Sequence, residues 1–334
     1  MAQAAKVLGQ AMINDLRSIY FEPYGPFPYE AHKALVDALA AYGPSKMVFL
    51  PYNDQRETSR QVRHSVEAFR PDLVIFGYLG NLDMADIAYL REKCPDTFLV
   101  NYIADAVTIW DGLFDVTRAF DWTVVSSPSD FPAFAAHGIE VGSFPGWTQH
   151  QYLQVKRELT AASPDVVFIG SLYFEHTFPG VAFRRESVQA MAASGLRFEL
   201  YGQGWERAGV ESQGGTYGQY TRNAAIYAGA RIGLSVDDVR DKYCCCSDRP
   251  YNIAATGCMV LTASFPGMEW NGWVDGKTCV SFDTTAEMVD KARYYLANEV
   301  EREAIGQAGR KLVHDRHVWP ARIEALWAML EGLP

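Results

Sequence analysis

The residues best suited to hold a charged ligand lie in segment 247–262. Ser247, or the residue after it, is a good helix cap, and Pro250 suits the first turn because the amide it lacks has no partner there. Gly257 is placed to end the helix in the left-handed conformation. Arg249 then stands at the positive end of this helix, where backbone amides and a guanidinium together favour a diphosphate. An ordinary helix–strand joint with a surface arginine is the competing interpretation.

Two other segments place glycine directly after a buried strand. Gly170 and Ser171 follow the apolar run 165–169, and a second loop ends the strand expected at 197–201. This second loop reads Tyr201-Gly202-Gln203-Gly204-Trp205. Glycine lets the backbone approach a ligand closely, and the flanking aromatic residues could stack on a base. With no third glycine the loop is not a dinucleotide fingerprint, and a plain turn is the alternative in both places.

The order of these motifs along the chain resembles the C-terminal half of CgeB-type (spore-maturation type) glycosyltransferases, which are group-1 enzymes. The resemblance covers roughly residues 165–332 and is looser upstream. Besides the segments above, it rests on Phe168–Tyr173, Arg184-Arg185-Glu186, Gly267-Met268-Glu269, Trp273–Lys277, Val280-Ser281-Phe282 and Ala308-Gly309-Arg310. It implies an α/β GT-B fold, with two Rossmann-like doubly wound parallel-sheet domains facing a cleft. It also implies transfer of a sugar from a nucleotide-sugar donor to an unidentified hydroxyl-bearing acceptor, with no bound metal or other cofactor.

The resemblance assigns the nucleotide-sugar to the second half of the chain. The expected contacts are Gly170, Ser171, Tyr201, Gly202, Gly204, Trp205, Ser247, Arg249, Pro250, Tyr251 and Asn252. Asn252 stands where related enzymes carry a glutamate that holds ribose hydroxyls. Cys244, eight residues before Asn252, replaces the other acid of the wider family. These departures leave the donor and the degree of activity open.

Chemistry on the acceptor side points to Asp105, which follows the apolar run 97–102. A carboxylate at the end of a parallel strand could orient the acceptor hydroxyl or accept its proton, although a helix cap is an equal alternative. The loop 24–29 is a candidate wall of the acceptor site. His150 could act as a base, but a linker histidine is more often structural. His176 is a candidate phosphate contact. His314 and His317 are expected to be solvated helix-end residues.

The alternation of apolar runs and amphipathic segments predicts two parallel α/β domains. Strands are expected at 46–50, 72–77, 97–102, 122–126, 165–170, 197–201, 230–235, 259–262 and 279–282. Segment 6–20 is ambiguous between a strand and a helix. The expected boundaries are 1–150 for the acceptor-side domain, 151–318 for the donor domain, and 319–334 for a terminal helix that packs back on the first domain.

Composition sets limits on partners and location. The 334 residues carry a net charge of −10, which argues against a general nucleic-acid binder. No apolar run reaches the length of a membrane span, and the first residues lack a secretory pattern, so a cytoplasmic location is expected. The six cysteines show no disulfide framework or paired zinc spacing, and Asp237-Asp238 is expected to be exposed rather than metal-binding.

Two other functions compete with sugar transfer. A noncatalytic protein that keeps the GT-B shell to bind a ligand or a partner is favoured by the neutral Asn252. An epimerase of the same fold is a third possibility, for which catalytic carboxylates are not evident.

Overall fold

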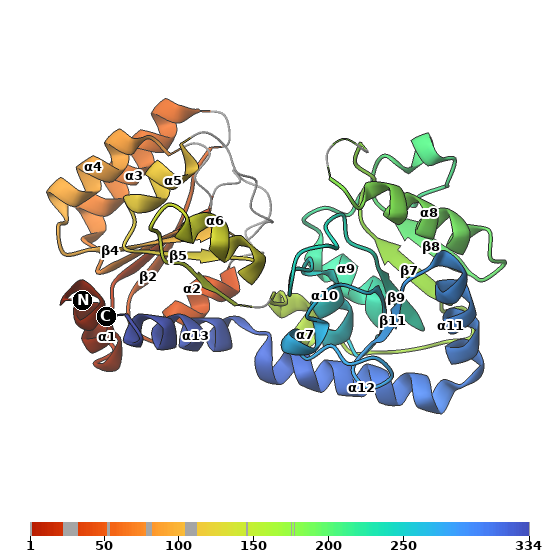
Figure 1. Ribbon diagram of the computed structural model, residues 1–334. Coiled ribbons are helices and arrows are strands. Elements are labelled where there is room, and N and C mark those ends of the chain that lie inside the picture. The colour runs from red at the N-terminus through yellow and green to blue at the C-terminus, as the bar shows by residue number, and fades with distance from the viewer. Residues whose placement is uncertain are drawn as a thin grey trace. The chain divides into compact units, whose positions relative to one another are not determined.

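The computed structural model of the protein describes residues 2–22, 33–51, 54–77, 82–103, 112–144, 146–174, 176 and 178–333. The chain divides into two compact units, which are Met1–Phe144 together with Trp319–Pro334, and Pro145–Val318. Each unit is built around one parallel sheet, as the sequence predicts (Figure 1). Residues 146–150, which the sequence placed in the first domain, belong to the second unit.

The sheet of the first unit has its strands in the order β2-β1-β3-β4-β5-β6, all parallel. They are β1 (Ser18–Glu22), β2 (Ser45–Phe49), β3 (Leu73–Phe76), β4 (Phe98–Ile103), β5 (Trp122–Val125) and β6 (Gly142–Ser143). The ambiguous segment 6–20 contains both alternatives, since helix α1 (Ala2–Met12) precedes β1.

One face of this sheet is covered by α3 (Gln55–Phe69) and α4 (Met84–Lys93). Val66 and Ile87 of these helices share an apolar core with Phe21 and Phe76 of the strands. The Asp54 carboxylate fixes the start of α3 by accepting a hydrogen bond from the Glu57 amide at 2.9 Å. Shorter helices complete the unit, namely α2 (Lys33–Leu39), α5 (Leu113–Arg118) and α6 (Phe131–Ala135).

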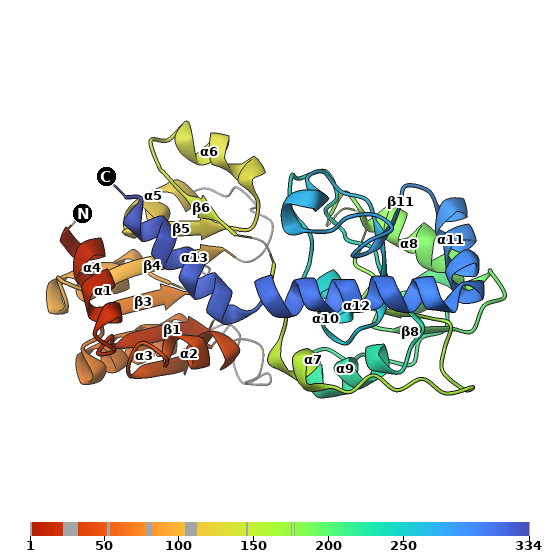
Figure 2. The same cartoon turned by 90° about the horizontal axis from the view of Figure 1, so that it is seen from below.

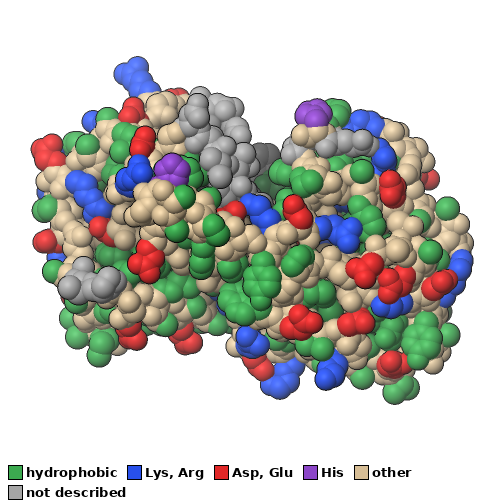
Figure 3. All heavy atoms as spheres, viewed as in Figure 1, with side chains coloured by type: hydrophobic (Ala, Val, Ile, Leu, Met, Phe, Trp, Pro, Cys, Tyr) green, Lys and Arg blue, Asp and Glu red, His purple; other side chains and the backbone are tan. Residues whose placement is uncertain are grey.

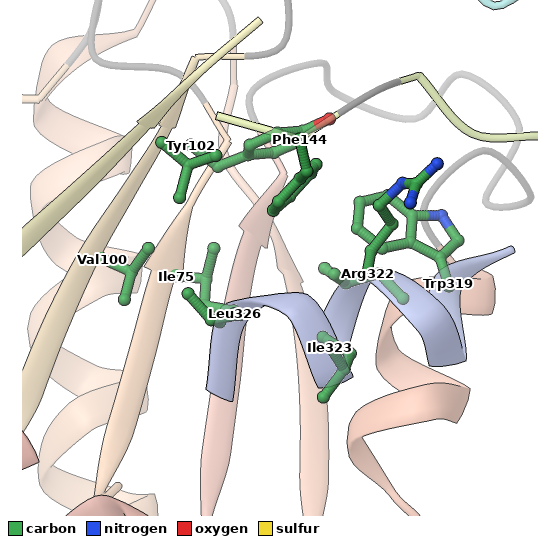
Figure 4. A pocket seen from close by; sticks show the side chains of 10 residues that line it. Ile75, Val100, Tyr102, Phe144, Trp319, Arg322, Ile323 and Leu326 are labelled. Carbon is green, nitrogen blue, oxygen red and sulfur yellow. The ribbon is translucent and has the colours of Figure 1, made fainter. Parts of the chain in front are cut away.

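The other face is covered by α13 (Trp319–Glu331), although this helix lies far away in the sequence. It packs against α1 and α2 (Figure 2). Its Ile323 and Leu326 face Ile75 and Val100 of the strands (Figure 4). The cavity left between them measures ≈ 20 Å³, which is space for about one water molecule. This cavity is therefore a packing gap and has no room for a substrate.

The sheet of the second unit is also parallel, with the order β11-β10-β9-β7-β8. Its strands are β7 (Val166–Ile169), β8 (Phe198–Tyr201), β9 (Ile232–Ser235), β10 (Met259–Ala263) and β11 (Val280–Phe282). Its helices are α7 (His150–Gln154), α8 (Val181–Ala192), α9 (Tyr220–Ala228), α10 (Arg249–Ala255), α11 (Thr285–Ala297) and α12 (Glu299–Arg316). Side chains alternate between two cores, one on each face, because successive residues of a strand point in opposite directions.

Candidate functional site

The two glycine loops lie side by side at the carboxyl edge of the second sheet, where ligands of parallel α/β folds usually bind. Gly170 N donates to the Tyr201 oxygen at 2.8 Å, and Leu172 N donates to the Gln203 oxygen at 2.9 Å. Gly202 has a φ of +140°, and a Cβ there would lie 2.1 Å from the Gly170 oxygen. Glycine is therefore required at position 202, and the two backbones meet without a side chain between them.

Trp205 supports these loops from the interior. Its side chain is fully buried, and its Nε1 donates to the Gly170 oxygen at 2.7 Å. Its ring meets the Phe168 ring edge-on. The expectation that Trp205 stacks on a base is therefore wrong, because the ring has no exposed face. Gly204, with a φ of +86°, begins the 3₁₀ turn that carries Trp205 inward.

Tyr201 and Ser171 remain partly accessible beside the loops. Tyr201 Oη donates to Glu199 Oε2 at 2.7 Å. Burial, together with the Glu199 carboxylate, raises the pKa of Tyr201 to about 12, so the phenol stays neutral at physiological pH. Ser171 Oγ accepts a hydrogen bond from Gln203 N at 3.2 Å. Both residues stay predicted ligand contacts.

Arg249 is the first residue of α10 and its guanidinium is held inside the unit. Nε donates to the Ile169 oxygen and Nη1 donates to Asp237 Oδ1, both at 2.8 Å, and the side chain is 12% exposed. The guanidinium carbon lies 4.9 Å from the centre of the Phe168 ring. Nη2 faces Gly170, because a Cβ on Gly170 would lie only 2.8 Å from it. The Arg249 side chain is thus held in a fixed position and is not a free surface cation. Its Nη2 edge faces the backbone of Gly170, which has no side chain.

Asp237 organises the approach to α10. Its carboxylate accepts from Ser247 N at 3.0 Å, from Ser247 Oγ and from Arg249 Nη1. The expectation that Asp237 and Asp238 are exposed is wrong, since their side chains are 12% and 11% exposed. Asp237 pairs with Arg249 and Asp238 pairs with Arg184. The two carboxylates lie in the interior because the buried arginines need partners of opposite charge.

The second arginine of this cluster is Arg184, at the start of α8. It pairs with Asp238, and its Nε and Nη1 donate to Val236 O and Ser171 O at 2.8 and 3.1 Å. Burial and the nearby Arg249 lower the pKa of Arg184 to about 10, which still leaves it charged at neutral pH. Burial raises the pKa of Asp238. Arg184 therefore stabilises the first glycine loop through its hydrogen bond to the Ser171 carbonyl oxygen.

The rest of α10 is core. Pro250 and Tyr251 are buried, which corrects the expectation that they contact the ligand. Asn252 Oδ1 accepts from Thr148 Oγ1 at 2.9 Å and from Gln149 N at 3.3 Å. These partners, with the bond from Asn252 Nδ2 to the Asp248 carboxylate, give Asn252 a structural task in place of the ribose contact.

Two details at the ends of α10 bear on the sequence predictions. Gly257 follows the helix with a φ of +83°, which confirms its predicted left-handed conformation. At the other end, Ser247 Oγ accepts from Arg249 N at 3.3 Å, whereas Asp248 makes no side-chain cap bond to the backbone.

Several predicted residues lie elsewhere. Asp105 and the loop 24–29 are outside the described residues, so their acceptor-side roles stay predictions. His150 begins α7 and is half-buried. His176 is exposed and stacks on the Phe174 ring with centroids 5.7 Å apart. His317 is 1% exposed, which overturns the expectation of a solvated residue.

The sequence analysis missed Asp237 as part of this site, and it did not decide which of Arg184 and Arg185 belongs to it. A usable signal existed for both. Asp237 comes two residues after strand β9, and Arg184 lies in the first turn of α8, the helix that follows the first glycine loop. In a parallel sheet, residues just after the strands gather at one edge, so charged side chains there deserve priority over charges elsewhere.

Within the described ranges, no group of three or more His, Cys, Asp or Glu side chains is placed to hold a metal ion. None of the described helices has the length and apolar character needed to span a bilayer. Basic side chains on the face seen in Figure 3 are scattered among acidic ones and form no continuous stripe.

A family model described as "Glycosyl transferase-like" matches residues 184–328. This match includes Arg184, Asp237 and the whole of α10. No curated protein sequence matches the chain.

Solved structures of low sequence identity have a similar fold. Anabaena HepE in complex with UDP-glucose aligns with a TM-score of 0.65 at 11% identity, covering 95% of this chain and 100% of that one. Sucrose-phosphate synthase from Thermosynechococcus elongatus aligns with a TM-score of 0.63 at 13% identity, covering 94% of this chain and 99% of that one. The fold is GT-B. A glycosyltransferase from Rickettsia africae aligns with this GT-B chain at a TM-score of 0.65 and 9% identity, covering 96% and 100%.

Proposed function

We propose that this GT-B protein transfers a sugar from a nucleotide-sugar to a hydroxyl-bearing acceptor. In this reaction the acceptor oxygen bonds to the sugar carbon, the bond from that carbon to the diphosphate breaks, and the nucleoside diphosphate leaves. The acceptor proton passes to a base, for which Asp105 is the candidate.

One observation carries the proposal, which is the placement of Arg249 against Gly170. Gly170 leaves the guanidinium edge beside bare backbone, and the Asp237 carboxylate and the Ile169 carbonyl hold the guanidinium in place. A preorganised cation stabilises the charge that develops on a leaving diphosphate, because the site does not have to reorganise as the bond breaks.

The comparisons support the same reaction class. The family match covers the arginines and α10, and HepE has been seen with UDP-glucose bound. We further propose that the donor nucleotide binds the second unit and the acceptor the first, and that no divalent ion is required.

The test is incubation of the protein with UDP-, GDP-, TDP- and CMP-sugars, with release of the free nucleotide as the readout. Calorimetric titration with each free nucleotide separates binding from turnover. We expect one nucleotide to bind and its sugar conjugate to be consumed. A protein that binds none of the nucleotides would refute the proposal.

A second candidate is a nucleotide-binding protein without transferase activity. It is favoured by Asn252, whose side-chain oxygen and nitrogen are bonded to Thr148, Gln149 and Asp248 instead of being presented to a ribose. Binding of a nucleotide without hydrolysis or transfer, with a broad set of acceptors offered, would select this candidate over the first.

A further inference from the structure

His317 is a buried histidine whose two ring nitrogens both face carbonyl oxygens. Nδ1 lies 3.2 Å from the Gly146 oxygen and Nε2 lies 2.8 Å from the Asn271 oxygen. A neutral imidazole carries one N–H and one lone pair, so one of these contacts would set a lone pair against a carbonyl oxygen. An imidazolium has two N–H donors and satisfies both.

The surroundings of the ring also favour the positive charge. His317 caps the C-terminal end of the 18-residue helix α12, where the helix dipole stabilises a cation. The Trp273 ring stacks on it at an interplanar angle of 9°, and the Tyr251 ring centre lies 4.7 Å away. Aromatic faces attract a cation, and two charge-assisted hydrogen bonds oppose the cost of removing it from water.

Described titratable groups on α10 and α12 lie near the His317 ring. Tyr251 of α10 faces it, with its Oη 3.5 Å from Cys246 Sγ, and burial raises the pKa of the Cys246 thiol well above its usual value. The Cys246 thiol therefore stays neutral near physiological pH. On α12, His314 Nε2 lies against the Ala255 oxygen, and the neighbouring Asp315 pairs with Lys311.

We propose that His317 is a buried imidazolium and a positioning residue for α10, the helix that begins with Arg249. Three links connect it to that helix. The Tyr251 ring contacts the His317 ring in a tilted arrangement, and Gly146 must be glycine because a Cβ there would lie 2.3 Å from the Tyr251 ring. Thr148 N donates to the His317 oxygen at 2.9 Å.

The third link reaches the polar network of the helix. The Thr148 hydroxyl and the Gln149 amide donate to Asn252 Oδ1. The charged ring thus fastens the segment 146–149 and α10 to each other. If His317 loses one ring proton, one of its two hydrogen bonds to carbonyl oxygens is lost. A nitrogen lone pair then faces a carbonyl oxygen.

The first experiment is ¹⁵N NMR of the ring nitrogens in the whole protein, with the His317 signals assigned by their absence in His317→Gln. We expect both nitrogens to carry protons at about pH 7.5, where an unfolded histidine, with a pKa near 6.5, is mostly neutral. A ring with one bare nitrogen at that pH overturns the proposal. The protonation state itself is read from the wild-type spectrum, and the variant is needed only for the assignment.

The second experiment compares chemical unfolding of the wild type, His317→Gln and the matched control His314→Gln over a pH series. If the ring is held protonated, its folded pKa exceeds the unfolded one. Its contribution is then complete below about pH 6 and is lost as pH rises through the folded pKa. The ratio of wild-type to His317→Gln folding constants should fall at least about tenfold between about pH 5.5 and about pH 8.5, a factor of ten for each unit of pKa shift. His314→Gln should keep the wild-type pH slope, and a flat or reversed ratio for His317→Gln overturns the charge.

The third experiment measures the affinity for the free nucleotide selected by the panel, and here the inference rests on the proposed function. We expect wild-type affinity to weaken as pH rises through the range where His317 loses its proton, and His317→Gln to lack this component. Equal pH profiles for the two proteins refute the positioning role. Absence of nucleotide binding by the wild type would refute the proposed function instead, and the first two experiments would still decide the charge.

Discussion

Arg249 and His317 are two basic side chains held in the interior of the second unit, both in contact with α10 or part of it, and they are compensated differently. Arg249 pairs with the Asp237 carboxylate at 2.8 Å. The ring nitrogens of His317 face backbone carbonyl oxygens of Gly146 and Asn271. The arginine is a permanent cation and takes a counter-ion, whereas the histidine can surrender its proton and is held by dipoles.

The comparison shows that α10 combines a permanent charge, on Arg249, with contacts to His317 that depend on protonation. Removing a partner of the Arg249 pair strands a full charge inside the protein, which is costly. Removing the proton of His317 leaves a neutral ring in the same place. Substitutions near Arg249 should therefore cost more stability than changes of pH near His317.

The largest effect is expected for Arg249→Ala, which leaves Asp237 buried without its cation. We expect unfolding in urea to show a loss of about 3–5 kcal/mol, the range for breaking a buried ion pair from one side. If the variant folds, nucleotide affinity should also fall by about 2–4 kcal/mol through loss of a charge-assisted contact. Arg249→Ala combined with Asp237→Asn should recover part of the stability but none of the affinity. Unchanged affinity would remove Arg249 from the donor site.

Gly202→Ala should come next, because it disturbs the loop pair against which Arg249 rests. The added Cβ would meet the Gly170 oxygen at 2.1 Å in a backbone with φ of +140°. Clash and backbone strain together suggest a loss of about 3 kcal/mol in unfolding free energy. Gly195→Ala is the control, since Gly195 also has a positive φ (+79°) but no atom within 4 Å of the added Cβ, and about 1 kcal/mol is expected there. Equal losses would show that the loops separate easily.

The two neighbouring aspartates offer a finer comparison. Asp237→Asn weakens the bonds to Arg249 and Ser247 and should cost about 1–3 kcal/mol. Asp238→Asn should cost a similar amount, because it leaves the Arg184 guanidinium, whose side chain is 4% exposed, without its carboxylate partner. Thermal unfolding of both variants beside the wild type is the measurement. A loss confined to one of the two variants would contradict the idea that each aspartate compensates its own arginine.

The smallest expected effect is that of removing divalent ions. If Arg249 and the backbone amides supply the positive charge for the diphosphate, excess EDTA should leave the rate of nucleotide release unchanged. Restoring Mg²⁺ or Mn²⁺ after EDTA treatment serves as the control. A rate that drops with EDTA and returns with metal would show that the fixed charge alone is insufficient.

Sequence periodicity was enough to predict the strands of the second unit, because apolar runs in a buried parallel sheet stand out between helices. The same periodicity left segment 6–20 undecided, since a helix and a strand follow each other there within a few residues. The glycine loops could be placed because they directly follow buried strands.

Side-chain roles were harder to predict, and the reason is physical. Trp205, Tyr251 and Asn252 stand at positions typical of ligand contacts, but whether a side chain turns outward depends on long-range packing. Trp205 donates a hydrogen bond to the Gly170 oxygen, and Asn252 accepts one from Thr148. These partners lie 35 and 104 residues away in the sequence. His317 was mistaken for a solvated residue because its carbonyl partners, Gly146 and Asn271, lie 171 and 46 residues away in the sequence.

The position of α13 has a consequence for the order of folding during synthesis. The second unit is contiguous and can complete its core as soon as its last residue leaves the ribosome. In the first unit, the strand face that carries Ile75 and Val100 stays without its covering helix until residues 319–331 have been made. Because exposed apolar surface on a nascent chain is prone to aggregation, the first unit is the one that depends on rapid completion of translation or on a chaperone.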